Sequence, residues 1–271
     1  MIKRILTAVI GIPLLIYIIN SGGIIFFISL MIVSSVGLWE YSKSVNKNKQ
    51  IKINYILEIS LGIFLLCIFN YKSEWVVPGV VFSFMMIFVY EIIKGKADIL
   101  QGIFSFFGIM YIPILFGHIL LFQTLRHGML ILWLVFIICF STDTFAYLIG
   151  IRFGKHKLCP NISPKKSVEG AIAGTIGSVI MSLTYGYLLN FFNLLDFSLY
   201  YYFILAFITS ILSQFGDLTA SLIKRYFGVK DFGNILPGHG GVLDRFDSII
   251  FAAPIVYYFT LYSLNGVITW G

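Results

Sequence analysis

Charged residues are scarce in this chain of 271 residues. Only 11% of the residues are charged, whereas 59% are hydrophobic, and the mean hydropathy is +0.93. A soluble domain of this length could not bury so much apolar surface, so the composition excludes that class. The composition is typical of helical membrane proteins. We therefore expect an all-α polytopic membrane protein.

Cysteine and several common catalytic motifs are also rare or missing. The three cysteines, Cys67, Cys139 and Cys159, have the spacing of neither a metal site nor a disulfide framework. The sequence contains no G-x-x-x-x-G-K-[ST] phosphate loop, no H-E-x-x-H zinc motif, no nucleophile elbow and no dinucleotide fingerprint. The first apolar segment has no clear small-residue cleavage site, so we do not expect a cleaved signal peptide.

Long apolar runs are abundant and set the predicted architecture. Hydropathy predicts nine membrane spans, over residues 5–21, 23–39, 54–70, 75–93, 99–122, 128–150, 168–190, 199–223 and 247–265. Of the 19 Lys and Arg residues, all but Lys72 and Arg126 fall in connections on one side. This asymmetry predicts a cytosolic N-terminus and a C-terminus outside. Topology and anionic headgroups account for the net charge of +7, so we expect no nucleic-acid partner.

Two polar clusters exceed what topology requires, and both are predicted to face the cytosol. They lie within residues 141–170 and residues 214–247. Counted from the predicted interface at 1.5 Å per residue, Asp143 is roughly 12 Å deep and Asp217 roughly 10 Å deep. Charged groups are costly near lipid, so such clusters indicate a functional site. We expect the two carboxylates to share one polar cavity.

Both clusters also allow a purely structural interpretation. Asp143 could join two helices through a hydrogen bond. Residues 163–166, Ser-Pro-Lys-Lys, could begin a helix, with the proline in its first turn and the lysines as interfacial anchors. The functional interpretation of the same segment is a helix N-terminus that binds an anion with two cations. His239 could be a turn residue or a donor to a phosphate oxygen.

Residues 221–247 form a signature of many fixed polar positions. They fit the pattern Ser, any, apolar, Lys-Arg, four residues, Lys-Asp, any, small, two residues, apolar, Pro, any, His-Gly-Gly, apolar, any, Asp-Arg, apolar, Asp, without departure. This run resembles the signature of the phosphatidate cytidylyltransferases, the CDP-diacylglycerol synthases. Residues 143–147 and 163–167 are similar to further segments of that family, so the resemblance covers residues 140–250.

The resemblance implies a nucleotidyltransferase that converts CTP and phosphatidate into CDP-diacylglycerol and pyrophosphate for phospholipid biosynthesis, with Mg²⁺ as cofactor. It implies that Asp217 and Asp244 bind the metal. The implied catalytic residues are Asp217, Asp244, Lys224, Arg225 and His239. The implied substrate-binding residues are Asp143, Ser163, Lys165, Lys166, Ser167, Ser221, Lys230, Asp231, Gly240, Gly241, Arg245 and Asp247.

The implied reaction suits the residues present. The phosphate of phosphatidate is itself a nucleophile, so no Ser, Cys or His nucleophile is needed, and the chain has only to position groups and neutralise charge. We expect the carboxylates of Asp217 and Asp244 to be unpaired charges in a low-dielectric cavity, so their replacement by Asn should abolish turnover but leave the fold intact.

We expect one integral membrane unit, in which residues 1–127 supply spans without a recognised motif and residues 128–271 form the catalytic region. The resemblance implies a bacterial-type inner (plasma) membrane, an active site that faces the cytosol, and a homodimer as a candidate assembly. Two alternatives stay open. One is a CTP-dependent polyprenol or other lipid kinase, and the other is a transporter of anions.

Overall fold

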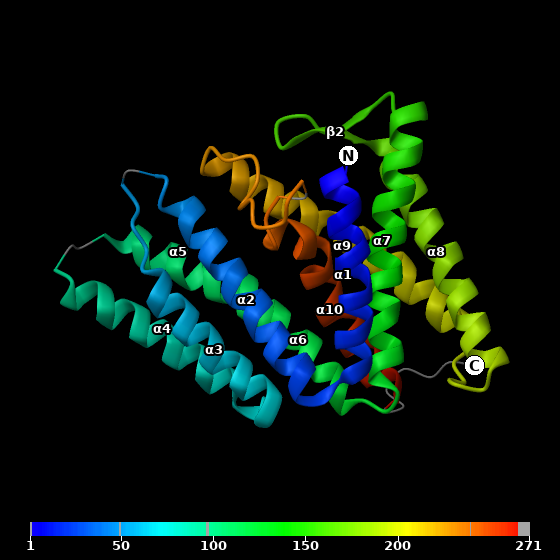
Figure 1. The fold of residues 1–271 in the computed structure, drawn as a ribbon, viewed down its shortest axis with the longest axis horizontal. Coiled ribbons are helices and arrows are strands. Elements are labelled where there is room, and N and C mark those ends of the chain that lie inside the picture. The colour runs from blue at the N-terminus through cyan, green and yellow to red at the C-terminus, as the bar shows by residue number, and fades with distance from the viewer. Residues whose placement is uncertain (1, 49, 96–97, 239, 265–271) are drawn as a thin grey trace. The chain divides into compact units, whose positions relative to one another are not determined.

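The computed structural model describes residues 2–48, 50–95, 98–238 and 240–264, and helices dominate it (Figure 1). Seven of the described helices are long and apolar enough to cross a membrane, and two apolar helices, Val9–Ser21 and Tyr55–Tyr71, are shorter. The predicted class, a helical polytopic membrane protein, is confirmed. The count of nine spans and the orientation of the termini stay predictions.

The chain forms two compact units, and each is described by itself. Unit 1 comprises Met1–Gln123 and Ile223–Phe246. Unit 2 comprises Thr124–Leu222 and Asp247–Gly271. Residues 223–246, most of the signature, therefore belong to the same unit as the N-terminal helices. The predicted division into residues 1–127 and 128–271 stays a prediction.

Unit 1 is a set of helices with two clear side-chain caps. Asn54 accepts hydrogen bonds from the first amides of α3, and Asp98 accepts one from Leu100 of α5, so each fills the role of an N-cap. The helices of its N-terminal part are α1 (Ile2–Ser21), α2 (Gly23–Val45), α3 (Tyr55–Tyr71), η1 (Ser73–Trp75), α4 (Val76–Ile93), α5 (Ile99–Ile109), η2 (Met110–Ile114) and α6 (Leu115–Leu121).

The predicted span 99–122 is one apolar run with an interruption. The π-helical turn η2 separates α5 from α6 and contains Pro113. Proline has no N–H to donate to the preceding turn, so the regular α-helical pattern breaks at this point. The short helix η3 (Phe122–Thr124) ends the run.

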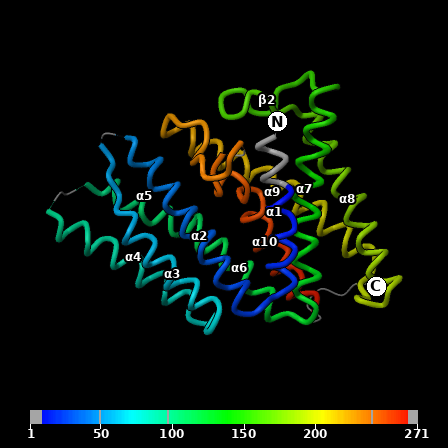
Figure 2. The backbone as a smooth tube through the Cα atoms, in the orientation of Figure 1, coloured from blue at the N-terminus to red at the C-terminus, as the bar shows by residue number. Residues whose placement is uncertain are grey.

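Unit 2 contains the long helices α7 (Gly128–Phe153) and α8 (Val168–Phe191), which run side by side (Figure 2). Their close approach depends on glycine, because a Cβ on Gly174 would lie 2.7 Å from the carbonyl oxygen of Thr142. Most of α9 (Leu199–Tyr226) and of α10 (Leu243–Leu264) also belongs to this unit. On α8, Ile172, Ile176 and Ile180 are exposed along one side, as a lipid-facing stripe requires.

Residues 163–167 are a strand, which corrects the interpretation of this segment as a helix start. They form β2 (Ser163–Ser167), which pairs antiparallel with β1 (Lys157–Cys159). Pro164 therefore lies in a strand and not in a first helical turn. Proline favours an extended conformation in the residue before it, which suits this hairpin. Helix α8 begins at Val168, as predicted, with the Ser167 side chain accepting a hydrogen bond from the Gly170 amide.

Candidate active site

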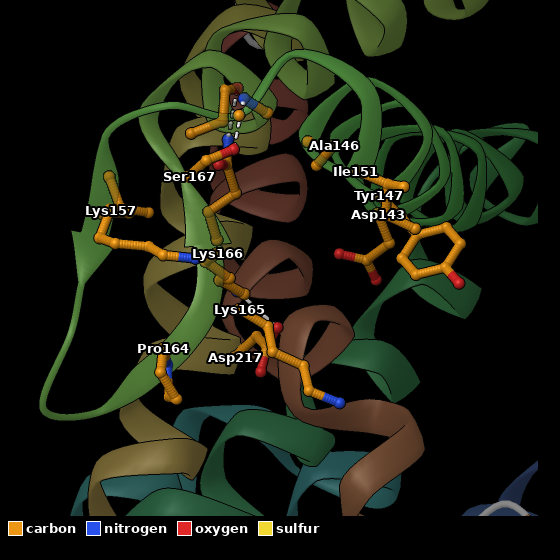
Figure 3. Close-up of a pocket in the computed structure, with 16 residues that line it drawn as sticks. Asp143, Ala146, Tyr147, Ile151, Lys157, Pro164, Lys165, Lys166, Ser167 and Asp217 are labelled. Atoms are coloured by element: carbon orange, nitrogen blue, oxygen red, sulfur yellow. Dashed lines mark hydrogen bonds and ion pairs between the residues drawn. The ribbon is translucent and has the colours of Figure 1, made fainter.

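A pocket of about 660 Å³ lies in unit 2, between α7, the hairpin, the start of α8 and residues 214–217 of α9. Figure 3 shows Asp143 and Tyr147 of α7 on one side of it, and Lys165, Lys166 and Asp217 on the other. The prediction that Asp143 and Asp217 share one polar cavity is confirmed. The lining residues are Asp143, Ala146, Tyr147, Gly150, Ile151, Gly154, Lys157, Leu158, Pro164, Lys165, Lys166, Ser167, Gly170, Ala171, Gln214 and Asp217.

The hairpin is held against α8 by Glu169. Its carboxylate accepts hydrogen bonds from the backbone amides of Lys155 and His156, and lies 2.6 Å from Nδ1 of the His156 ring. Glycines allow the backbones to meet closely beside it, because a Cβ on Gly170 would lie 2.7 Å from the carbonyl oxygen of Ala146. These contacts fix the chain where it enters β1, and β1 in turn pairs with the strand that carries Lys165 and Lys166.

Within the pocket, Lys166 and Asp217 form an ion pair. Nζ of Lys166 lies 2.5 Å from Oδ2 of Asp217, and each side chain is 27% exposed. The Ser221 hydroxyl, one helical turn farther along α9, donates to Oδ1 of Asp217 at 3.5 Å. Lys165 lines the same pocket and is exposed. With Lys157, three cations and two carboxylates therefore border one cavity.

A second polar group lies in unit 1, around Asp244. Oδ1 of Asp244 lies 2.7 Å from Nζ of Lys224, and Oδ2 accepts hydrogen bonds from the amides of Phe232 and Gly241 at 2.9 and 3.1 Å. The Asp244 side chain is only 4% exposed. The Lys224 ammonium also lies over the Phe232 ring, 5.4 Å from its centroid.

These contacts correct the premise that the two aspartates are unpaired charges. Asp217 is paired with Lys166, and Asp244 is paired with Lys224. Removing the Asp244 charge would leave a buried ammonium without its carboxylate, which destabilises a fold. We therefore still expect the partly exposed Asp217 to tolerate replacement by Asn, whereas we now expect Asp244→Asn to destabilise the fold.

Sequence reasoning missed Glu40. This residue of α2 is fully buried, and its carboxylate accepts hydrogen bonds from the amides of Val242 and Leu243 at 3.1 and 2.9 Å. The sequence shows only an acidic residue at the end of an apolar run. Acidic residues are common at such positions because the membrane interface lies there, so this one did not stand out. Its partners lie at the far end of the chain, so spacing alone could not reveal the contact.

The remaining predicted residues occupy varied positions. Arg225 donates to the carbonyl oxygen of Val229, and Asp247 is buried and accepts from the Ser248 amide. Gly240 has a φ of 84°, which favours glycine, and bridges to Leu236. Ser163 begins the second strand, and exposed positions hold Lys230, Asp231 and Arg245. The predicted catalytic residue His239 lies outside the described residues.

The part of the chain that the structure describes contains no group of three or more His, Cys, Asp or Glu side chains arranged to hold a metal ion. A cage built from protein ligands alone is therefore absent from these residues. Mg²⁺ is commonly bound by one or two carboxylates together with substrate phosphates, and the carboxylates of the pocket fit that smaller donor set.

Comparison with known proteins identifies the family. The phosphatidate cytidylyltransferase of Staphylococcus saprophyticus is 34% identical over 258 residues, which cover 93% of this chain and 96% of that protein. Proteins of the same name from Staphylococcus aureus and Staphylococcus epidermidis are 33% and 31% identical with the same coverage. A sequence profile of the cytidylyltransferase family matches residues 2–263. The resemblance seen in the signature is thus confirmed, and the chain belongs to the cytidylyltransferase family.

Proposed function

We propose that this nucleotidyltransferase transfers the cytidylyl group of CTP to phosphatidate, giving CDP-diacylglycerol and pyrophosphate. The observation that carries the proposal is the pocket of unit 2, where Lys157, Lys165 and Lys166 border one cavity with two carboxylates. Such a cavity suits a polyanionic nucleotide beside helices long enough to cross a membrane. The names of the relatives support the same substrates.

The reaction needs little covalent chemistry from the protein. An oxygen of the phosphatidate phosphate attacks the α-phosphorus of CTP and forms a new P–O bond. The bond from the α-phosphorus to the bridging oxygen breaks, and pyrophosphate leaves with that oxygen. Positioning and charge neutralisation then determine the rate. Lys165 and Lys166 lie on β2, which pairs with β1, and Glu169 binds the amides just before β1, so the two cations are held at the pocket while the phosphates bind.

Mg²⁺ is part of the proposal, with Asp217 and Asp244 as the carboxylates that the family resemblance implies for it. The Asp217 carboxylate faces the pocket and is partly exposed, which suits a ligand that must also meet substrate phosphates. A bound Mg²⁺ would neutralise charge that develops on the phosphate oxygens. The Lys166 ammonium, already beside Asp217, limits repulsion between that carboxylate and an entering phosphate.

The proposed location is the inner (plasma) membrane, with the pocket facing the cytosol. The distribution of basic residues supports this orientation, since 17 of the 19 fall in connections on one predicted side. CTP would then enter from the cytosol and the lipid from the surrounding leaflet. The homodimer that the resemblance implies stays a prediction.

Labelled CTP tests the proposal against its two alternatives. The purified full-length chain, with phosphatidate and Mg²⁺, should move label from the α-phosphate of CTP into a lipid product and release the γ-label as pyrophosphate. A lipid kinase would instead place the γ-label on a lipid alcohol. A transporter would form no labelled lipid at all. Either of these last two results would contradict the proposal.

A further inference from the structure

Glu40 places a buried negative charge at the start of α10. Its two carboxylate oxygens each accept one backbone amide, Oε1 from Val242 and Oε2 from Leu243. Because α10 begins at Leu243, these amides lack partners within the helix. A carboxylate at a helix N-terminus is also favoured by the helix dipole. The contact therefore fixes how the chain enters α10.

Two glycines of the signature leave room for the same carboxylate. A Cβ on Gly233 would overlap Oε1 of Glu40, and a Cβ on Gly241 would lie 2.6 Å from Oε2. Both distances are too short for any larger residue. Glu40 of α2, about two hundred positions earlier in the chain, thus explains why glycine occupies these two signature positions.

Glu40 is part of a row of α2 residues that face the signature segment. The Ser44 hydroxyl donates to two carbonyl oxygens, that of Glu40 at 2.9 Å and that of Phe232 at 3.4 Å. One turn before Glu40, a Cβ added to Gly37 would lie 3.7 Å from a methyl group of Leu243. Positions i, i+3 and i+7 lie on one face of a helix. Residues 232–233 and 241–243 therefore pack against this face of α2.

The same backbone segments hold Asp244. The amides of Phe232 and Gly241 both donate to Oδ2 of Asp244, while the Phe232 carbonyl accepts from Ser44 and Gly241 packs on Glu40. A shift of Glu40 would move these two amides and the aspartate that they orient. Asp244 in turn holds Lys224 at 2.7 Å.

We propose that Glu40 is a positioning residue for the cytidylyl transfer. It fixes residues 232–233 and 241–243 against α2 and thereby sets the orientation of Asp244 and Lys224, without touching a substrate. The kinetic part of this inference rests on the proposed function, whereas the structural part does not.

Glu40→Gln in the full-length chain tests the proposal, with Glu91→Gln as the matched control. Glutamine keeps the shape but turns one acceptor into an NH₂ donor, which faces a backbone N–H and cannot accept from it. Glu91 is also a buried carboxylate of unit 1, but it pairs with Lys94. Because small misplacements near reacting groups are costly, we expect kcat to fall about tenfold or more for Glu40→Gln, with an unchanged KM for CTP. Glu91→Gln should retain normal kinetics.

Amide hydrogen exchange provides a readout that needs no turnover. In Glu40→Gln, peptides covering residues 232–243 should exchange faster than in the unaltered chain, and in Glu91→Gln they should not. An unchanged kcat, a change in KM alone, or unchanged exchange in Glu40→Gln would overturn the proposal. If the unaltered chain forms no CDP-lipid, the proposed function fails, while the exchange comparison still decides whether Glu40 fixes the segment.

Ser44→Ala decides the question if Glu40→Gln does not fold. This variant removes only the Ser44 hydroxyl, which donates to the carbonyl oxygens of Glu40 and Phe232. We expect faster exchange at residues 232–233 and a smaller fall in kcat, with the KM for CTP unchanged. Exchange and kcat both equal to those of the unaltered chain would overturn the proposal.

Discussion

Lys166 of the hairpin and Asp217 of α9 are joined by an ion pair inside the pocket of unit 2, with 2.5 Å between Nζ and Oδ2. Both side chains are partly exposed, and ion pairs of that kind contribute only about 0–1 kcal/mol to folding. The pair therefore has little value for stability. Its position on the wall of the cavity gives it value for binding, because it keeps a cation and a carboxylate in fixed relation where a nucleotide would enter.

The double substitution Lys165→Ala and Lys166→Ala should weaken the use of CTP with little effect on stability. Removing two cations from a triphosphate site should raise the KM for CTP or lower kcat/KM by about tenfold or more, since charge-assisted hydrogen bonds are lost. Steady-state kinetics on the purified variant provide the measurement. Lys47→Ala, an exposed lysine of the connection after α2, is the control and should behave normally. Unchanged kinetics in the double variant would contradict a role in CTP binding and would identify both lysines as interfacial anchors.

Asp244→Asn should destabilise the protein as well as inactivate it. The substitution leaves the buried Lys224 ammonium without its carboxylate, and breaking one side of a buried pair costs about 3–5 kcal/mol. We expect a lower Tm in detergent than for the unaltered chain or for Asp217→Asn. Replacing Lys224 by Met in the Asp244→Asn background should recover much of the Tm. A Tm for Asp244→Asn equal to that of the unaltered chain would show that the pair does not carry this energy.

Gly233→Ala should reproduce the effect of losing Glu40. The new methyl group would overlap the Glu40 carboxylate, which must then leave the amides of Val242 and Leu243. We expect kcat to fall about tenfold, because the misplacement reaches Asp244. Gly11→Ala is the control, since a Cβ at that position meets no atom within 4 Å. Equal loss in both variants would indicate a general cost of replacing glycine and not a clash with Glu40.

The predicted orientation is open to a direct test with fusion reporters. A reporter that is active only outside the cytosol should be active at the C-terminus and silent in the hairpin that contains residues 157–167. The reason is the asymmetry of Lys and Arg between alternate connections. A stably expressed C-terminal fusion without reporter activity would contradict the count of nine spans.

Much of the site was predictable because helix geometry is regular. The depths of Asp143 and Asp217 follow from a fixed rise per residue, and the two carboxylates indeed line one pocket. The hairpin was not predictable in the same way. A proline and two lysines before an apolar run suit a first helical turn. Only the pairing of Ser163–Ser167 with Lys157–Cys159 shows that the segment is a strand.

The contacts of the signature were the least predictable part. The carboxylate of Glu40 meets amides 202 and 203 residues later, and no periodic pattern encodes such a distance. The pairing of Lys224 with Asp244 is also non-local, since it joins the end of α9 to the start of α10. The signature shows which residue types are present, whereas the tertiary contacts show which of them hold one another.

Pyrophosphate release from CTP in the presence of phosphatidate and Mg²⁺ tests the central claim most directly, with the unaltered chain and Asp217→Asn measured side by side. The account predicts one pyrophosphate for each CDP-diacylglycerol formed by the unaltered chain. It predicts a rate at least about a hundredfold lower for Asp217→Asn, because an amide replaces a pocket carboxylate proposed to hold the metal. A folded Asp217→Asn with a near-normal rate at limiting Mg²⁺, or an unaltered chain that releases no pyrophosphate, would contradict it.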